Sequence, residues 1–238
     1  MSKNELLFMK SCGENKPKEV QAFLNLAKTL EIDINAVDEF GATAAYKAAM
    51  LGHTEIIKIL AATGLVDWNK GSLKSYTPLN VALAFGHSDV VGIIVKQDNI
   101  NFTLQTHRAG WTLAIAAVFG GNITCVEILA KQENCDCWNI PNRDGVTPLM
   151  EIIRKKKMDV LKILLNCPRV DPNLKDQYGN SPVMEAIKMK ESAMAIMMIK
   201  CPRVDLETKD RNGASLQRIA RWKERKVNLI FDELIFEF

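Results

Sequence analysis

Apolar residues follow a helical pattern in four short segments of this chain. Each segment groups Ile, Val or Leu so that they line one face of a helix, which is typical of a helix packed against a core. A shorter apolar stretch precedes each of the first three and ends at Gly52, Gly86 or Gly121, and glycine is a favoured helix terminator. The pattern therefore predicts pairs of helices in series. The four groupings are Ile56, Ile57, Ile59 and Leu60; Val90, Val91, Ile93 and Ile94; Val126, Ile128 and Leu129; and Val160, Leu161, Ile163 and Leu164.

A turn residue precedes each helix pair at a nearly constant interval. The intervals between successive turn residues are 34 or 35 residues. A period of this size, kept over five intervals, indicates a solenoid of stacked repeats, which offers a long surface and rarely a catalytic pocket. The turn residues are Gly41, Ser75, Gly110, Gly145, Gly179 and Gly213.

The repeats carry the same local signals in the same order. An Asp-x-x-Gly sequence, as at Asp38 and Gly41, suits a tight turn because Asp accepts hydrogen bonds from the following backbone and Gly tolerates positive φ. Thr-Pro-Leu, as at 77–79, lets a hydroxyl cap a helix while Pro occupies the first turn. A strip such as 66–68 closes each repeat, and we interpret these strips as extended hairpin arms. Further copies are the turns at Asp176 and Asp210, the helix starts at Thr147 and Ser181, and the strips at Ile32, Ile100, Val170 and Val204.

Together, the turn, the Thr-Pro-Leu helix start, the Gly-His helix end and the Val-Asp strip resemble the ankyrin repeat. The resemblance covers nearly the whole chain. It implies an all-α, ankyrin-type solenoid of stacked helix pairs with projecting β-hairpin turns. We expect a single domain over 1–238 with seven helix pairs: a divergent pair at 1–37, repeats that begin near 38, 72, 107, 142 and 176, and a C-terminal capping repeat at 210–238.

The chain departs from the family pattern in three places. The His that usually follows Thr-Pro-Leu is replaced throughout, so its hydrogen bonds between neighbouring turns must be replaced or lost. Glycine at the helix end gives way to Lys156, Lys190 and Glu224, and a non-glycine residue in a left-handed cap costs on the order of 1 kcal/mol unless the helix continues. In the first pair Gly13 holds the glycine position, and we expect helices over 5–12 and 17–30, the second longer than in other repeats. The residues in the His position are Tyr46, Asn80, Ile115, Met150, Met184 and Arg218.

Composition agrees with a soluble protein of the cell interior. The chain is 47% hydrophobic and 25% charged, and no apolar run is long enough to span a membrane. The first residues lack the apolar centre of a signal peptide. We therefore expect a monomer in the cytoplasm, with the nucleus as an alternative location, and regard the glycosylation sequons at Asn101 and Asn122 as chance matches.

The sequence indicates no metal site and no catalytic centre. Cys167 and Cys201 lie in equivalent places of successive repeats, roughly 10 Å apart, which is too far for a disulfide. Cys135 and Cys137 lack a second Cys/His pair at zinc spacing, so we interpret them as structural thiols. Nucleophile, phosphate-loop and zinc-protease motifs are all absent from the sequence. We expect no enzymatic activity, no catalytic residue, no metal and no cofactor.

The resemblance places partner binding at the hairpin tips and at the exposed ends of the first helices, which line the concave face. These positions are apolar or aromatic in the N-terminal half and mostly basic in the C-terminal half. Residues 1–140 hold 12 Lys/Arg against 14 Asp/Glu, a net charge of −2, and residues 141–238 hold 19 against 14, a net charge of +5. The candidate partner-binding residues are Phe40, Met50, Leu51, Leu73, Tyr76, Phe85, Trp111, Phe119, Arg143, Arg154, Lys155, Lys188, Arg211 and Trp222.

We interpret the chain as a non-catalytic protein–protein interaction module or scaffold. The partner is a protein or peptide segment that sets apolar residues against the aromatic half and acidic residues against the basic half. Tyr76 and Trp111 follow turn residues and are expected to be exposed anchors. Phe85 and Phe119 are equally consistent with packing on a hairpin, and the basic run 154–157 with a solvated helix end.

Two alternatives stay open. The basic half could bind an anionic ligand, either nucleic acid or an acidic lipid, and such binding would depend strongly on salt. A half-domain charge of +5 is modest for a nucleic-acid-binding protein, so we expect a protein partner instead. The chain could also be a structural spacer within a larger protein.

Overall fold

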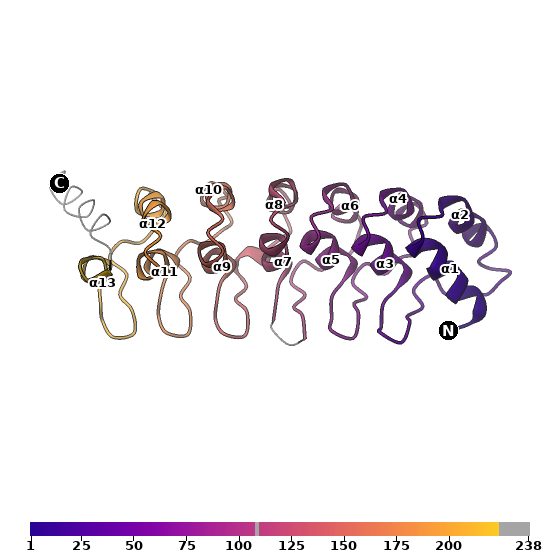
Figure 1. Ribbon diagram of the computed structural model, residues 1–238, viewed down its shortest axis with the longest axis horizontal. Coiled ribbons are helices and arrows are strands. Elements are labelled where there is room, and N and C mark those ends of the chain that lie inside the picture. The colour runs from indigo at the N-terminus through magenta and orange to yellow at the C-terminus, as the bar shows by residue number, and fades with distance from the viewer. Residues whose placement is uncertain (108–109, 224–238) are drawn as a thin grey trace. The chain divides into compact units, whose positions relative to one another are not determined.

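The computed structural model describes residues 1–107 and 110–223, with the side chains of 222 and 223 left out. Within these ranges the regular structure is helical, apart from one isolated bridge between Lys209 and Ser215 in the last described hairpin. The predicted all-α class is therefore confirmed. The chain divides into two compact units, which we call unit 1 (residues 1–135) and unit 2 (residues 136–238). Figure 1 shows the helices and the connecting loops of each unit.

Unit 1 consists of four helix pairs stacked side by side. The first helices α1, α3, α5 and α7 pack against one another in order, and the second helices α2, α4, α6 and α8 form a parallel row. The hairpin loops project from the first-helix row (Figure 1). The helices span Lys3–Gly13 (α1), Pro17–Asn25 (α2), Ala44–Met50 (α3), Thr54–Ala62 (α4), Pro78–Ala84 (α5), Ser88–Ile94 (α6), Leu113–Gly120 (α7) and Ile123–Ala130 (α8).

Unit 2 repeats this arrangement. Helices α9, α11 and α13 form its first row, and α10 and α12 pack in the second. A short 3₁₀ turn, η1 (Cys137–Asn139), precedes them. The second half of the expected capping repeat, 224–238, lies outside the described residues. The helices span Pro148–Arg154 (α9), Met158–Leu165 (α10), Pro182–Lys188 (α11), Ser192–Ile199 (α12) and Leu216–Lys223 (α13).

Threonine caps start the first helices as the sequence indicated. In α5 the Thr77 hydroxyl accepts a hydrogen bond from the Asn80 backbone N–H. The Asn80 side-chain oxygen in turn accepts one from the Thr77 backbone N–H. The hydroxyls of Thr43, Thr112 and Thr147 likewise accept from the backbone N–H three residues on in α3, α7 and α9, without the reciprocal side-chain bond. Ser181 is the exception among them: it holds the capping position of α11, but its hydroxyl makes no capping bond. The expected cap at Ser181 is therefore wrong.

The turn chemistry is confirmed by direct hydrogen bonds. One carboxylate oxygen of Asp38 accepts from the backbone N–H groups of Phe40 and Ala42, each at 2.9 Å. Gly41 has a φ of 72°, the left-handed conformation that such turns require. Asp176, Asp210 and Asn142 accept the same pair of backbone bonds in unit 2.

The described strips between repeats form no strand, and each runs into a turn or bend, so the expected hairpin arms are not β-structure. The Asn35 amide explains why: its oxygen accepts from the Asp67 backbone N–H at 2.8 Å, and its nitrogen donates to the Leu65 carbonyl at 2.9 Å. Asparagine thus joins one turn to the next repeat and satisfies backbone groups that a strand would have paired. Asn69, Asn139 and Asn173 make equivalent pairs of bonds.

The first helix pair differs from its prediction. Helix α1 runs through Gly13, and the left-handed residue after it is Asn15, with a φ of 56°. Asparagine is the residue that best replaces glycine in this conformation. Helix α2 ends at Asn25, so the second helix of this pair is not extended.

The core lies where the apolar stripes of the second helices meet the first helices. Ile57, Leu60, Leu129 and Leu161 are fully buried. One isoleucine of each stripe is only half-buried, which corrects our assignment of that position to the core; these residues are Ile59, Ile93, Ile128 and Ile163.

Candidate protein-binding surface

Five large apolar side chains are exposed at the hairpin tips and first-helix ends of unit 1. Phe40 and Leu73 lie at hairpin tips and are 66% and 72% exposed, and Phe85 follows α5 with 62% exposed. Leu51 and Phe119 at the ends of α3 and α7 are also exposed. We call these five residues the apolar face of unit 1. Exposed apolar side chains of this size and number are typical of protein-binding surfaces.

Backbone and ring contacts hold this face together. The Leu73 backbone N–H donates to the Phe40 carbonyl at 3.0 Å, so the two hairpin tips are neighbours. The rings of Trp111 and Phe119 stack with centroids 4.3 Å apart, which joins the arm of a hairpin to the end of its helix. Hairpin and helix end therefore form one surface within a repeat.

Three predicted residues of unit 1 are less exposed than expected. Tyr76, Trp111 and Met50 are half-buried. Trp111 is covered by its stack on Phe119, so the expectation that Tyr76 and Trp111 are freely exposed anchors is wrong. The more exposed aromatic residues are Phe40 and Phe85, and the structure does not pack Phe85 into a hairpin.

The equivalent surface of unit 2 is cationic. Arg143 and Arg211 are exposed at hairpin tips, and Arg154 and Lys155 are exposed at the end of α9. Lys188 at the end of α11 is half-buried. Trp222 lies in α13, and its side chain falls outside the described part of the chain. We call Arg154, Lys155, Lys156, Lys188 and Lys190 the cationic face of unit 2.

Most of these cations contact carboxylates of the chain itself. Arg154 Nε lies 2.6 Å from Glu185 Oε1, and Lys156 Nζ lies 2.7 Å from Glu191 Oε1. Lys188 contacts both the Asn180 amide oxygen and the Asp210 carboxylate. Each carboxylate belongs to the following repeat or hairpin, so the ion pairs join neighbouring repeats. At the protein surface such pairs contribute about 0–1 kcal/mol each.

Two lysines of the cationic face occupy left-handed backbone. Lys156 and Lys190 have φ values of 55° and 61°, where the equivalent Gly52 and Gly86 of unit 1 have 72° and 75°. The helices α9 and α11 therefore end here and do not continue for a further turn. A side chain in this conformation costs about 1 kcal/mol relative to glycine.

The family is shown by comparison with known proteins. The family model described as "Ankyrin repeats (3 copies)" matches residues 8–106 and 113–210, which together are most of the chain. The chain belongs to the ankyrin-repeat family. Ankyrin repeats are generally protein–protein interaction modules, which agrees with the exposed face described above.

A solved structure confirms the ankyrin-repeat fold. The crystal structure of the ankyrin repeat domain of Bcl-3, described as a unique member of the IkappaB protein family, matches with a TM-score of 0.85. The match covers 94% of this chain and 97% of that chain, with 13% sequence identity. At this identity the likeness concerns the fold alone.

Two histidines of this ankyrin-repeat protein, His53 and His87, make hydrogen bonds between neighbouring repeats. His53 Nε2 lies 2.9 Å from the Gly13 carbonyl oxygen, and His87 Nε2 lies 3.1 Å from that of Met50. Each ring thus satisfies a carbonyl at the end of the preceding first helix. Asn122 does the same for Gly86, donating from its amide nitrogen at 2.8 Å.

The cysteines and acidic residues show no metal-binding arrangement. Among the described residues, no group of three or more His, Cys, Asp or Glu side chains is placed to hold a metal ion. Burial raises the pKa of Cys12 to about 12 and that of Cys125 to about 11, which keeps both thiols protonated at neutral pH. Cys135 and Cys137 are fully buried.

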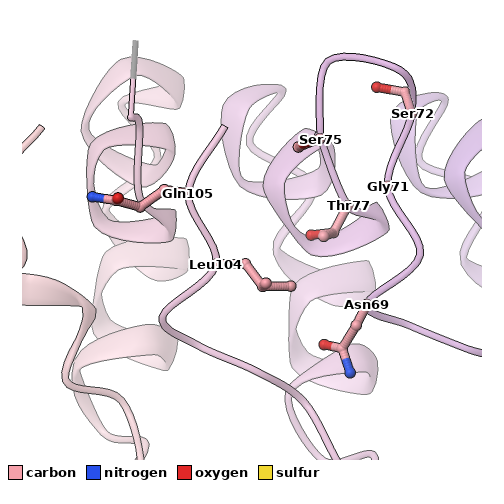
Figure 2. Close-up of a pocket in the computed structure, with 7 residues that line it drawn as sticks. All are labelled: Asn69, Gly71, Ser72, Ser75, Thr77, Leu104 and Gln105. Atoms are coloured by element: carbon pink, nitrogen blue, oxygen red, sulfur yellow. The ribbon is translucent and has the colours of Figure 1, made fainter. Parts of the chain in front are cut away.

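The hollows in the surface are small. One of about 200 Å³ lies beside the second hairpin of unit 1 (Figure 2). Figure 2 shows the Leu104 side chain directed towards Thr77, while the Gln105 amide points away from it. None of its seven lining residues is charged at neutral pH, so this hollow offers no acid–base chemistry. It is lined by Asn69, Gly71, Ser72, Ser75, Thr77, Leu104 and Gln105.

Sequence reasoning missed one exposed aromatic residue of unit 2. Tyr178 is 62% exposed at a hairpin tip of unit 2 and occupies the same turn position as Phe40. The shared Asp-x-x-Gly position was the signal that could have found it. No helix of the described ranges is long and apolar enough to cross a membrane.

Proposed function

We propose that this ankyrin-repeat protein is a non-catalytic scaffold that binds a segment of another protein across its hairpin tips and first-helix ends. The observation that supports this most strongly is the apolar face of unit 1, where five large side chains are exposed at related repeat positions. Water contact with this surface is unfavourable, and covering each side chain contributes on the order of 1 kcal/mol to a complex.

The cationic face of unit 2 supplies the second part of the proposed site. Opposite charge on the partner speeds association and orients the partner, while apolar contacts slow dissociation. The partner segment therefore combines apolar residues for unit 1 with acidic residues for unit 2. The net charges of −2 over 1–140 and +5 over 141–238 support this division.

We further propose that the protein is a monomer, that it acts in the cytoplasm or nucleus, and that it consists of the seven repeats expected from the sequence. None of the six cysteines, all of which lie in the described ranges, forms a disulfide, as is usual for proteins of a reducing compartment. Binding of an anionic ligand by unit 2 is the second candidate, supported by the same cations. A spacer role makes no use of the exposed apolar face, and so we favour it less.

A peptide-library selection tests the proposal. Peptides selected on the wild-type chain should bind about 100-fold more weakly to the Phe40→Ser/Leu73→Ser/Phe85→Ser variant, because these side chains provide three apolar contacts of about 1 kcal/mol each. The matched control is Leu26→Ser/Leu65→Ser, which removes two exposed leucines of unit 1 that lie at the ends of second helices. If the control weakens binding as much as the triple variant does, the apolar face is not the binding site.

A further inference from the structure

The lysines at left-handed positions in unit 2 carry backbone strain that glycine would avoid. At Lys156 and Lys190 the backbone has the conformation that glycine adopts without steric cost, and unit 1 has glycine at the equivalent positions 52 and 86. Two successive repeats therefore carry a strained residue where the same fold has an unstrained solution. Backbone strain that recurs at one kind of position often marks a functional site.

The ion pair at Lys156 stabilises the fold by less than the left-handed backbone destabilises it. Lys156 Nζ contacts Glu191 Oε1 at 2.7 Å, but the Lys156 side chain is 66% exposed. Water and salt screen a pair at this exposure, so it offsets only part of the backbone strain. Stability alone would favour glycine at both positions.

We propose that Lys156 and Lys190, together with Arg154 and Lys188, bind an acidic segment of the protein partner. This inference rests on the proposed function and names the side chains of unit 2 that bind the acidic part of the partner. The carboxylates that pair with these cations, Glu185, Glu191 and Asp210, are largely buried, whereas the cations extend further into solvent. The outermost charge of this surface is therefore positive, and it complements carboxylates on a partner.

The spacing of the cations favours an acidic protein segment over nucleic acid. Successive first helices pack about 10 Å apart, so each repeat presents its cations at that interval. A DNA strand carries one charge per about 3.4 Å, and the interspersed Glu185 and Glu191 would repel so dense an array. Acidic residues seven apart on a helix are about 10 Å apart, as are residues three apart in an extended chain. A sparse acidic segment matches the repeat.

The test uses the whole chain, an oligothymidylate, and a fluorescent peptide of equal length that carries glutamate at every third position and is called oligoglutamate here. We expect Lys156→Gly/Lys190→Gly to bind oligoglutamate at least about threefold more weakly at about 50 mM salt, where screening is weak. The same variant should have a Tm roughly 2–5 °C higher than wild type, because glycine relieves the strain. A gain in stability with a loss of binding is a result that a purely structural role does not give.

The matched control is Lys162→Gln/Lys200→Gln, which removes two exposed lysines of unit 2 outside the cationic face. It should change oligoglutamate affinity by less than the glycine variant does. Equal losses in the two variants, unchanged binding in the glycine variant, a lower Tm in the glycine variant, or tighter binding of oligothymidylate than of oligoglutamate would each overturn the proposal. The apolar triple variant tests the proposed function separately, because it leaves every lysine in place.

Discussion

Units 1 and 2 build the same contact between a hairpin arm and a helix end from different chemistry. In unit 1 the Trp111 ring stacks on Phe119, which lies one position before the end of α7. In unit 2 the residues at those two repeat positions are Asn180 and Lys188, and they form a hydrogen bond. Two repeats thus make this contact with different side chains, so the surface can be apolar in one unit and cationic in the other.

A second comparison shows that neighbouring repeats are coupled. A Cβ atom built on Gly52 would lie 2.7 Å from His87 Nδ1 of the next repeat, so glycine here is required by the ring as well as by its φ of 72°. In unit 2 the same two positions hold Lys156 and Glu191, which form an ion pair. The Gly-His pair and the Lys-Glu pair are two solutions to one contact between repeats.

The largest expected effect comes from the core that both units share. Ile57→Ala in unit 1 and Leu161→Ala in unit 2 occupy the same place in the stripe, and both side chains are fully buried. Each change should lower the free energy of unfolding by about 2–5 kcal/mol. Because a solenoid is stabilised through neighbouring repeats, each variant should also separate the unfolding of its own unit from that of the other, which circular dichroism during urea denaturation would record as two transitions.

Ile163→Ala is the internal control for this prediction. Ile163 is half-buried in the same helix as Leu161, so its loss should cost clearly less. Equal midpoints for wild type and the Leu161 variant would show that the core has been assigned to the wrong helix face.

A smaller effect is expected from exchanging the chemistry of the two units. Gly52→Lys should cost about 2 kcal/mol, in part from left-handed strain and in part from the overlap with His87. In the presence of His87→Glu the same change should cost about 1 kcal/mol less, because the ring is gone and an ion pair can form. Denaturation of the wild type, both single variants and the double variant gives this coupling energy. Strict additivity would mean that the two pairs are not alternative solutions.

The repeat architecture could be predicted from sequence because its determinants are local. The turn at Asp38 and Gly41 and the cap at Thr77 use hydrogen bonds between residues two to four positions apart, so their spacing in the sequence is enough. The family match followed from the same spacing. Site positions could be carried over from repeat to repeat, and Phe40, Leu73 and Phe85 are exposed as those positions imply.

Contacts between residues that no local rule joins could not be predicted. The half-buried state of Trp111 depends on a ring eight residues away, and the Asn35 amide forms hydrogen bonds with backbone groups 30 and 32 residues away. The backbone strain at Lys156 could be expected from the sequence. Its ion pair with Glu191 of the next repeat could not. These features depend on how one repeat packs on the next, and a period in the sequence does not contain that information.

The smallest expected effect concerns the turn aspartates Asp38 and Asp210. Each contacts a lysine, which belongs to the same repeat in unit 1 and to the preceding repeat in unit 2. Burial raises the pKa of Asp38, but its hydrogen bonds with Lys47, Ala42 and Phe40 outweigh burial and leave the pKa below its ordinary value. Backbone hydrogen bonds from Ala214 and Asn212, with Lys188, likewise lower the pKa of Asp210. A carboxyl whose pKa is lowered on folding stabilises the protein above about pH 4, and this contribution is lost as the pH falls through the folded value.

Asp38→Asn and Asp210→Asn should each therefore cost less than about 1 kcal/mol at neutral pH, because the amide oxygen keeps the two backbone bonds, as Asn142 does naturally. The cost should disappear as the pH falls below the lowered pKa of the wild-type carboxyl, because that group is then protonated as well. Thermal unfolding of both variants between about pH 2 and pH 7 measures this. Lys47 lies in the same repeat as Asp38, whereas Lys188 lies in the repeat before Asp210. Equal curves of stability against pH for the two variants would show that a cation within a repeat and one from the neighbouring repeat are interchangeable. A cost that persists in acid would show that the hydrogen-bond geometry matters and the charge does not.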